Sequence, residues 1–147
     1  MANRYKELKG LNLPQIASEV STFWKENEVF ERSVTEREGN PSFVFYEGPP
    51  SANGMPGIHH VMGRTIKDIF CRYNTIQGKQ VKRKAGWDTH GLPIELAVEK
   101  TLGIRKEDIG TKITVEEYNK ACRSEVMKYT DKWEELTRVM GYWVDMK

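Results

Sequence analysis

Two short blocks of the sequence combine turn-forming residues with side chains that could do chemistry. Residues 48–60 read Gly-Pro-Pro-Ser-Ala-Asn-Gly-Met-Pro-Gly-Ile-His-His, and residues 86–95 read Gly-Trp-Asp-Thr-His-Gly-Leu-Pro-Ile-Glu. Glycines let a backbone approach a ligand closely, and prolines fix a loop before it binds. The imidazoles of His59 and His60 can hydrogen-bond phosphoryl oxygens and stabilise charge that develops in a transition state. The first block therefore predicts a phosphate-binding loop.

Other roles for these histidines stay open at this point. They could cap a helix or lie on the surface, and zinc binding is a third option because His59, His60 and His90 are the only histidines. Adjacent residues rarely chelate one ion together, and no cysteine is spaced as a zinc partner, so we expect no metal site. The block matches neither a P-loop nor a G-x-G-x-x-G motif.

Asp88 is the acid at the centre of the second block. A fixed carboxylate at this place can pair with a cationic ligand group such as an α-ammonium. An Asx-turn is the structural alternative, since Asp makes such turns readily. The neighbouring Trp87 could wall an apolar pocket or pack beneath the loop.

A strand–helix–strand unit is predicted to position the two blocks. Residues 42–46 are apolar on both faces, which is typical of a strand covered on both sides in a parallel sheet. A helix is expected over residues 58–77, with Gly78 as its C-terminal cap, followed by a shorter and more exposed strand at 80–84. Both blocks then follow strands at the carboxyl edge of the sheet, where nucleotides bind in α/β folds. Helical spacing predicts that the helix buries Ile58, Met62, Ile66, Ile69, Phe70, Tyr73 and Ile76.

Helices are predicted on either side of this unit. Pro14 can open the first one, with Asn12 as a nearby cap, and its apolar residues keep helical spacing as far as Phe30. A short helix begins at Pro93 and ends near Gly103.

A further, long helix is predicted near the end of the sequence. Thr114 and Glu117 fit a capping box, and the helix that they begin should continue to about Met140. Its apolar stripe, from Tyr118 to Met140, indicates core packing, with a partner surface as the lesser alternative. Residues 141–145 break the helix and could begin another element.

Composition limits the classes of function. The 147 residues carry a net charge of only +2, which gives no general case for polyanion binding. A local basic cluster at Lys79, Lys82, Arg83 and Lys84 is either a solvated strand edge or an RNA contact. No apolar run is long enough for a membrane span, and no signal peptide is visible. Cys71 and Cys122 lack C-x-x-C spacing, so we expect free thiols in a cytoplasmic protein that does not enter a membrane.

The sequence thus predicts an α/β fold, namely the N-terminal portion of a Rossmann-like parallel sheet flanked by helices. A doubly wound sheet normally has five or six strands, so two strands indicate a fragment of a larger catalytic domain. We expect an N-terminal helical extension at residues 1–41 and the first βαβ half of a nucleotide-binding domain at 42–104. Residues 105–147 should form a helical segment that leads toward an insertion domain.

The two blocks resemble class I aminoacyl-tRNA synthetases, and among them most closely the isoleucyl-tRNA synthetases. The resemblance rests on residues 47–54, Glu-Gly-Pro-Pro-Ser-Ala-Asn-Gly, on the histidines that follow, and on residues 86–95. The family's His-x-Gly-His signature aligns with residues 57–60, where Gly57 replaces the first His and His59 replaces the Gly. A Lys-Met-Ser-Lys-Ser-like loop, an editing insertion and anticodon-binding helices have no counterpart in these residues.

This resemblance implies that isoleucine is activated with ATP and then attached to its tRNA. A valyl or leucyl relative is one alternative, and a non-catalytic interaction module derived from the fold is another. The implied partners are isoleucine, ATP with Mg²⁺, tRNA and the remainder of the synthetase chain. Glu47 and Glu95 are weaker site candidates. The resemblance assigns catalysis to His60 and His59, ATP binding to Asn53, Gly54, Gly57, His59 and His60, and amino-acid binding to Gly48, Pro49, Pro50, Trp87 and Asp88.

Overall fold

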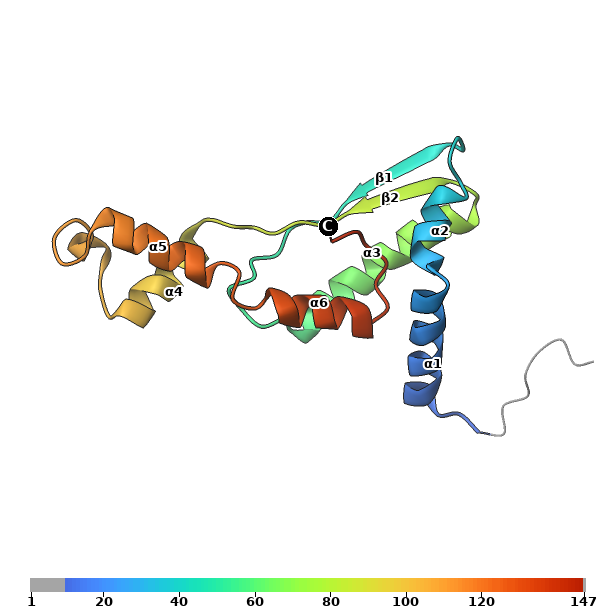
Figure 1. Ribbon diagram of the computed structural model, residues 1–147, viewed down its shortest axis with the longest axis horizontal. Helices are drawn as coiled ribbons and strands as arrows, with labels where there is room; N and C mark the ends of the chain where they lie inside the picture. The colour runs from blue at the N-terminus through green and yellow to red at the C-terminus, as the bar shows by residue number, and fades with distance from the viewer. Residues whose placement is uncertain (1–9, 147) are drawn as a thin grey trace, which may run out of the picture.

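The computed structural model describes residues 10–146, which form an elongated molecule with a small sheet toward one end (Figure 1). Helices α4 and α5 make an arm that projects away from the sheet. The helices and strands are α1 (Leu13–Glu26), α2 (Val29–Thr35), β1 (Ser42–Tyr46), α3 (Ile58–Ile76), β2 (Gln80–Lys84), α4 (Leu92–Leu102), a 3₁₀ turn (Lys106–Asp108), α5 (Val115–Glu125) and α6 (Thr130–Val139).

The sheet is parallel, as predicted. Strands β1 and β2 pair in register, with Phe43 beside Val81, and α3 connects them. A third segment adds to the other edge of β2, because the N–H of Asp145 donates to the carbonyl of Arg83 at 2.9 Å and its carbonyl accepts from Ala85 at 2.8 Å. The predicted further element after residue 141 is therefore an isolated parallel bridge between Asp145 and Lys84.

Local signals at the helix ends are confirmed. The side chain of Asn12 accepts the N–H of Gln15 at 3.2 Å at the start of α1. Gly78, just after α3, has a positive φ of 84°, a conformation that glycine adopts without strain. Thr114 and Glu117 form the reciprocal capping box at the start of α5.

Two predicted helices are each divided in two, and both predictions of a single helix are wrong. The N-terminal helix breaks at Glu28, whose φ of +47° is left-handed, and this separates α1 from α2. The long helix breaks between Glu125 and Thr130. The N–H of Tyr129 donates to the carbonyl of Ala52 at 2.9 Å, a tertiary contact that replaces the bond of a continuous helix.

The relative burial of the two strands is the reverse of the prediction. On β1, Val44 and Tyr46 are 54% and 75% exposed, whereas Val81 and Arg83 on β2 are buried. Strand β2 lies between β1 and residue 145 and packs against α3. Within residues 10–146 only β2 pairs with β1, so the outer edge of β1 is open.

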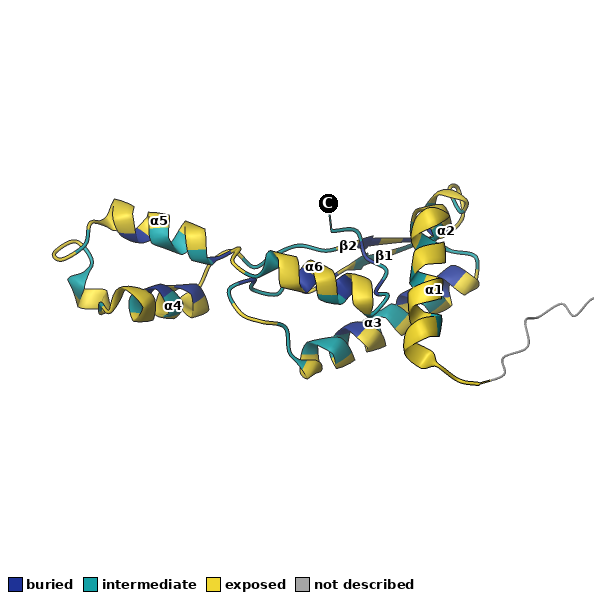
Figure 2. Ribbon diagram, turned by 60° about the horizontal axis from the view of Figure 1, so that its bottom comes forward, coloured by how far each residue is buried: buried dark blue, intermediate teal, exposed yellow. Residues whose placement is uncertain are grey.

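The buried stripe predicted for α3 is also wrong, because all seven of its apolar residues are between 54% and 78% exposed (Figure 2). The helix instead buries Arg64, Cys71, Asn74 and Thr75. It packs through this polar face onto β2, and it contacts the C-terminal segment through the same side. Neighbours for the apolar face are not present among the described residues.

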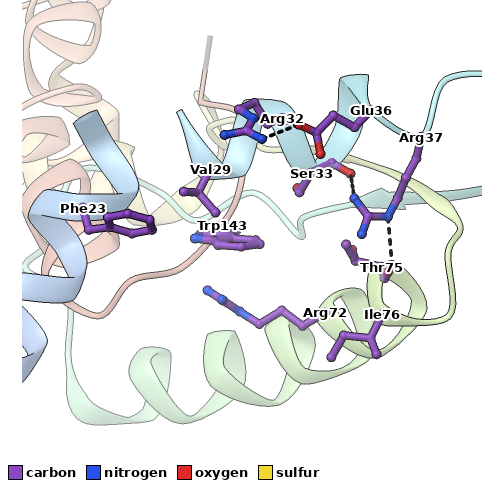
Figure 3. A pocket seen from close by; sticks show the side chains of 10 residues that line it. All are labelled: Phe23, Val29, Arg32, Ser33, Glu36, Arg37, Arg72, Thr75, Ile76 and Trp143. Atoms are coloured by element: carbon purple, nitrogen blue, oxygen red, sulfur yellow. Dashed lines mark hydrogen bonds and ion pairs between the residues drawn. The ribbon is translucent and has the colours of Figure 1, made fainter. Parts of the chain in front are cut away.

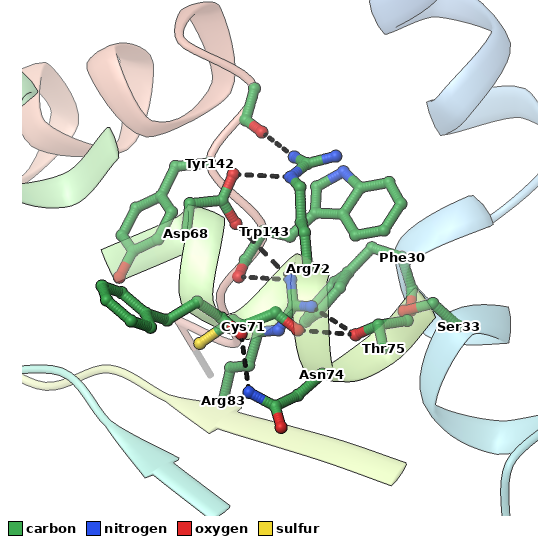
Figure 4. A network of polar contacts seen from close by, with 12 residues as sticks. Phe30, Ser33, Asp68, Cys71, Arg72, Asn74, Thr75, Arg83, Tyr142 and Trp143 are labelled. Atoms are coloured by element: carbon green, nitrogen blue, oxygen red, sulfur yellow. Dashed lines mark hydrogen bonds and ion pairs between the residues drawn. The ribbon is translucent and has the colours of Figure 1, made fainter. Parts of the chain in front are cut away.

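A network of charged side chains joins α3 to β2 and to the C-terminal segment (Figure 4). Asp68 binds Arg72 at 2.6 Å and lies 3.5 Å from Arg83. Arg83 also donates to the hydroxyl of Thr75 at 2.7 Å. The guanidinium of Arg72 lies 3.9 Å from the ring centre of Trp143 and donates to the carbonyl of residue 141 at 2.6 Å.

The N-terminal helices α1 and α2 pack against this network. Phe23 and Val29 line a pocket of about 460 Å³ together with Arg72 and Trp143 (Figure 3). Arg37 donates to the carbonyl of Thr75 at 3.1 Å, which ties the end of α2 to α3. The helical extension is therefore packed on the sheet end of the molecule.

The remaining core follows the prediction in part. Tyr118, Val126 and Trp133 of the predicted stripe are buried, which confirms core packing. Both cysteines are free thiols, but only Cys71 is fully buried and Cys122 is half-buried. Burial raises the pKa of the Cys71 thiol. No helix within residues 10–146 is both long and apolar enough to cross a membrane.

Candidate functional site

The two sequence blocks lie against each other at the carboxyl ends of β1 and β2. The N–H of Asp88 donates to the carbonyl of Pro50 at 3.0 Å, and Ser51 and Asp88 pair as in a parallel bridge. The side chain of Asn53 donates to the carbonyl of Pro93 at 3.1 Å. Backbone contacts thus join the glycine- and proline-rich loop to the turn that carries the predicted carboxylate.

The histidine pair occupies the first turn of α3, directly after Gly57 as the N-cap. The two rings are stacked at an angle, with centroids 3.8 Å apart. The N–H of Gly57 donates to Nδ1 of His60 at 2.9 Å. Because Nδ1 accepts this bond, the neutral imidazole of His60 carries its proton on Nε2, where it is a hydrogen-bond donor.

Several surrounding groups favour the neutral form of His60. Its pKa lies below the ordinary value of 6.5, first because of burial and then because of the nearby charges of His59 and Arg64. The bond from Gly57 also favours the neutral form, because a protonated Nδ1 could not accept it. An anion in the same space would oppose the lowering of the pKa, since a negative charge stabilises the imidazolium.

A pocket of about 250 Å³ opens beside the histidines. Its hydrogen-bond donors come from one face of α3, where His60, Arg64 and Lys67 follow one another at helical spacing. Its lining residues are Glu47, Gly48, Pro50, His59, His60, Gly63, Arg64, Lys67 and Trp133.

Glu47, at the end of β1, is the one acid of this pocket. It is buried, with one carboxylate oxygen paired to Lys67 and the other accepting the hydroxyl of Tyr142. Burial of the phenol and then this hydrogen bond raise the pKa of Tyr142. With Glu47 balanced by Lys67, the charge of Arg64 gives the pocket a positive excess that suits a phosphate group.

Arg64 is buried and held from two sides. Its Nη1 donates to the hydroxyl of Thr137 at 2.7 Å. The guanidinium lies 4.9 Å from the ring centre of Trp133 and 5.5 Å from that of Tyr142. Burial lowers the pKa of Arg64, while Glu47 opposes the shift. Such stacking and bonding fix the charge of an arginine in one place.

Trp133 lies where the loop, the histidines and the second block come together. Its Nε1–H donates to the carbonyl of Gly54 at 2.9 Å. Its ring packs edge-on against two others, with 4.6 Å between the ring centres of Trp133 and His60 and 6.4 Å between those of Trp133 and Trp87. Trp87 thus packs against Trp133 beside the histidines.

Asp88 has the geometry of an Asx-turn. Its Oδ1 accepts the N–H of His90 at 3.4 Å, and its side chain is 43% exposed. The carboxylate does not line the histidine pocket, although its backbone is bonded to Pro50. Glu95 lies apart from the histidine pocket and lines another one beside α5.

The structure brings some of the predicted site residues together and leaves others at the margin. Gly48, Pro50, His59 and His60 line one pocket, and Gly57 holds His60. The lining of this pocket does not include Pro49, Asn53, Gly54, Trp87 or Asp88.

Four further residues of this region were not predicted: Arg64, Lys67, Trp133 and Tyr142. Arg64 and Lys67 follow His60 by four and seven residues, and such positions share a helix face. This spacing could have identified both as pocket residues. The contacts of Trp133 and Tyr142 cross 79 and 95 residues, and no local pattern announces them.

The basic cluster of β2 does not form one surface patch. Arg83 is buried within the network with Asp68, whereas Lys82 and Lys84 are exposed. Lys84 pairs with Asp145 at 2.9 Å. In the part of the chain from 10 to 146, no three His, Cys, Asp or Glu side chains are grouped as a metal site requires.

The family model for tRNA synthetases class I (I, L, M and V) matches residues 19–147. The chain belongs to this class I family. Isoleucine–tRNA ligase of Bacteroides thetaiotaomicron is 69% identical over the whole chain, and that of Cytophaga hutchinsonii is 67% identical over 98% of it. The Streptomyces avermitilis ligase is 52% identical over 92%. The chain spans only 13% of the length of each of these relatives. The resemblance to the isoleucyl members of class I is thus confirmed.

A solved class I structure shares the fold. The agnB2 LeuRS of Agrobacterium radiobacter K84, in a ternary complex with tRNA and LeuAMS, superposes with a TM-score of 0.61. The superposition covers 88% of this chain and 14% of that one, at 20% identity. It confirms the predicted fold class, a Rossmann-like α/β fragment.

Proposed function

We propose that this chain carries the first half of the active site of an isoleucine–tRNA ligase. The enzyme would activate isoleucine with ATP and attach it to the cognate tRNA. One observation carries the proposal: His60, Arg64 and Lys67 face a single pocket at the N-terminus of a 19-residue helix. The similarity to isoleucine–tRNA ligases over the full chain supports the choice of amino acid.

The pocket suits the phosphates of ATP. A helix N-terminus offers free N–H groups and the positive end of a dipole, and both favour anions. The Nε2–H of His60 adds a neutral donor, and the lysine and arginine add charge. We assign His60, with His59, to the ATP phosphates, and the loop residues Asn53, Gly54 and Gly57 to the neighbourhood of the nucleotide.

Mg²⁺ would reach this site with the nucleotide. Glu47 is the one carboxylate of the pocket, and it is already engaged by Lys67 and Tyr142. Mg²⁺ in such enzymes is held largely by substrate phosphates and water, so it needs few protein carboxylates. When bound, it would neutralise part of the phosphate charge.

Activation joins the carboxylate of isoleucine to the α-phosphorus of ATP and releases pyrophosphate. Negative charge builds up on the phosphates as the bond to pyrophosphate breaks. His60 donates from Nε2 and Arg64 supplies the positive excess of the pocket, and both stabilise that charge. The protein forms no covalent bond in this step, so it acts by positioning the two substrates.

The amino acid is assigned to the junction of the two blocks. The backbone of Gly48, Pro49 and Pro50 would line its pocket, and Trp87 would form a wall. The carboxylate of Asp88 would pair with the α-ammonium group. The bond from Asp88 to Pro50 supports this assignment because it holds both parts of the pocket together.

The rest of the synthetase chain is the proposed partner of the uncovered surfaces. The apolar face of α3 and the open edge of β1 require neighbours, and the chain spans only 13% of its relatives. We retain residues 1–41, 42–104 and 105–147 as helical extension, nucleotide-binding half and helical segment toward an insertion domain; residues 1–9 and 147 of these spans lie outside the described residues. Free thiols at Cys71 and Cys122 support a reducing compartment, and we place the enzyme in the cytoplasm.

The alternatives have less support. A non-catalytic module would use the stripe from Tyr118 to Met140 for partner contacts, yet Tyr118, Val126 and Trp133 are buried within this chain. A valyl or leucyl specificity is tested below with the matching ligands.

Calorimetric binding of non-hydrolysable aminoacyl-adenylate analogues tests the proposal. The isoleucyl analogue should bind more tightly than the valyl and leucyl analogues. Asp88→Ala should weaken binding about tenfold or more, as expected for a lost bond to a charged group. Asp131→Ala is the control, since that side chain is 71% exposed on α6. Equal binding of the three analogues would overturn the isoleucine assignment, and unchanged binding in Asp88→Ala would remove Asp88 from the site.

A further inference from the structure

The N-terminal end of α6 supplies two hydrogen bonds to the glycine- and proline-rich loop. The backbone N–H of Tyr129 donates to the carbonyl of Ala52 at 2.9 Å. One helical turn later, the Nε1–H of Trp133 donates to the carbonyl of Gly54 at 2.9 Å. Ala52 is completely buried, so the loop is fixed at its centre. In a continuous helix, the N–H of Tyr129 would instead donate to the carbonyl four residues earlier in the same helix.

The indole ring of Trp133 contacts three other groups of the site. Its ring centre lies 4.6 Å from that of His60 and 6.4 Å from that of Trp87, edge-on in both pairs. The guanidinium of Arg64 lies 4.9 Å from the same ring centre. The side chain is 2% exposed, and it lines the histidine pocket from below the loop. One residue thus touches the loop, the donor histidine, the pocket arginine and the second block.

We propose that Trp133 is a positioning residue for the ATP-phosphate pocket. Its N–H holds the loop carbonyl at Gly54, and its ring holds His60 and Arg64 at the pocket wall. The inference rests on the proposed function, because the pocket is assigned to ATP there. Trp133 itself contacts no substrate in this account and acts through His60, Arg64 and the loop.

Trp143 provides a matched comparison within the same C-terminal segment. It also stacks with an arginine, since Arg72 lies 3.9 Å from its ring centre, and it meets Trp24 edge-on at 5.1 Å. It lines the pocket between the N-terminal helices and α3 and not the histidine pocket. If tryptophan packing alone mattered, the same substitution at either position would have the same consequences.

The test compares Trp133→Phe with Trp143→Phe in the full-length synthetase that carries this sequence. Phenylalanine keeps a ring and removes the N–H, so the bond to Gly54 is lost. Isoleucine-dependent exchange of pyrophosphate into ATP should show a KM for ATP raised about fivefold in Trp133→Phe, the effect of one hydrogen bond. Trp143→Phe should keep a KM within twofold of the wild type. Rates are expressed per active site, counted by the burst of adenylate formation, so that a misfolded fraction does not contribute.

Amide hydrogen exchange gives a readout that does not require activity. Peptides covering residues 51–60 should exchange faster in Trp133→Phe and at the wild-type rate in Trp143→Phe. Unchanged KM and unchanged exchange in Trp133→Phe would overturn the inference, as would equal changes in both variants. If the wild-type enzyme showed no isoleucine-dependent exchange of pyrophosphate into ATP, the proposed function would be contradicted instead. The amide hydrogen exchange of the loop would still decide whether Trp133 holds the loop.

Discussion

Helix α3 buries polar side chains on one face and exposes apolar side chains on the other. The buried face carries Arg64, Cys71, Asn74 and Thr75, each less than 10% exposed. The apolar face carries seven large side chains that are more than half exposed, from Ile58 to Ile76. An ordinary surface helix shows the opposite arrangement.

The two faces therefore suit different neighbours. The polar face is complete within this chain, because Arg64 and Thr75 find partners on α6 and β2. The apolar face has a pattern suited to burial, and an exposed patch of this kind marks an interaction surface. The site lies at the N-terminal end of the same helix, so the contacts of the polar face help to position His60.

Breaking the polar face should have the largest effect on stability. Arg83→Met removes the buried guanidinium and leaves Asp68 without one of its two arginine partners. Removal of one partner of a buried ion pair typically lowers the free energy of unfolding by about 3–5 kcal/mol. Denaturant unfolding measures the change. Lys82→Met on the same strand is the control, because that side chain is exposed and should cost less than about 0.5 kcal/mol. Similar losses in the two variants would contradict the role of the network.

Substitution on the apolar face should depend on whether the rest of the synthetase is present. Ile69 is 60% exposed here, so Ile69→Ala should change the stability of the 147-residue chain by less than about 0.5 kcal/mol. In the full-length enzyme the same change should cost about 2–4 kcal/mol, as for a buried isoleucine. Equal effects in the two chains would mean that this face is not an internal interface.

Removal of a single hydroxyl tests the hydrogen bond between Tyr142 and Glu47 on the polar side of α3. Tyr142→Phe deletes the donor to Glu47, which is buried and keeps Lys67 as its partner. A buried acceptor that loses one bond should cost about 1–3 kcal/mol. Tyr46→Phe, on a side chain that is 75% exposed, should be close to neutral in the same unfolding measurement.

The smallest expected effect concerns pH. The pKa of His60 is lower in the folded chain than its ordinary value of 6.5, so the unfolded chain binds more protons between the two values. Stability should therefore rise with pH in this range and level off above about 6.5. His60→Gln should remove this part of the pH dependence, whereas His90→Gln, with a 93% exposed side chain, should retain it. A His60 pKa above 6.5 in an NMR titration of the ligand-free protein would contradict the prediction.

Features with local causes could be predicted from the sequence. The cap at Asn12, the glycine at 78 and the capping box at Thr114 each act within a few residues, and all lie where expected. The histidine pair and its helix start were also found, because a motif and a helix boundary coincide there. The parallel pairing of the two strands followed from the strand–helix–strand order, although β1 is not covered on both faces as expected.

Features with distant causes could not be predicted in the same way. The buried face of α3 was assigned to its apolar side, since periodicity identifies a face suited to burial but not the neighbours that are present. The helix break at Tyr129 depends on the carbonyl of Ala52, which is 77 residues earlier in the chain, and no nearby glycine or proline marks it. Trp133 was assigned to the core, and its contact with Gly54 became visible only in three dimensions.

Hydroxyl-radical footprinting of Met62, Phe70 and Tyr73 tests the central claim most directly. These side chains are each more than 60% exposed in this chain, and we expect the rest of the synthetase to cover them. The 147-residue chain should be oxidised at all three, and the full-length enzyme should be protected at all three. Equal oxidation in both would contradict the claim that the apolar face of α3 is the contact between this half-site and the remainder of the enzyme.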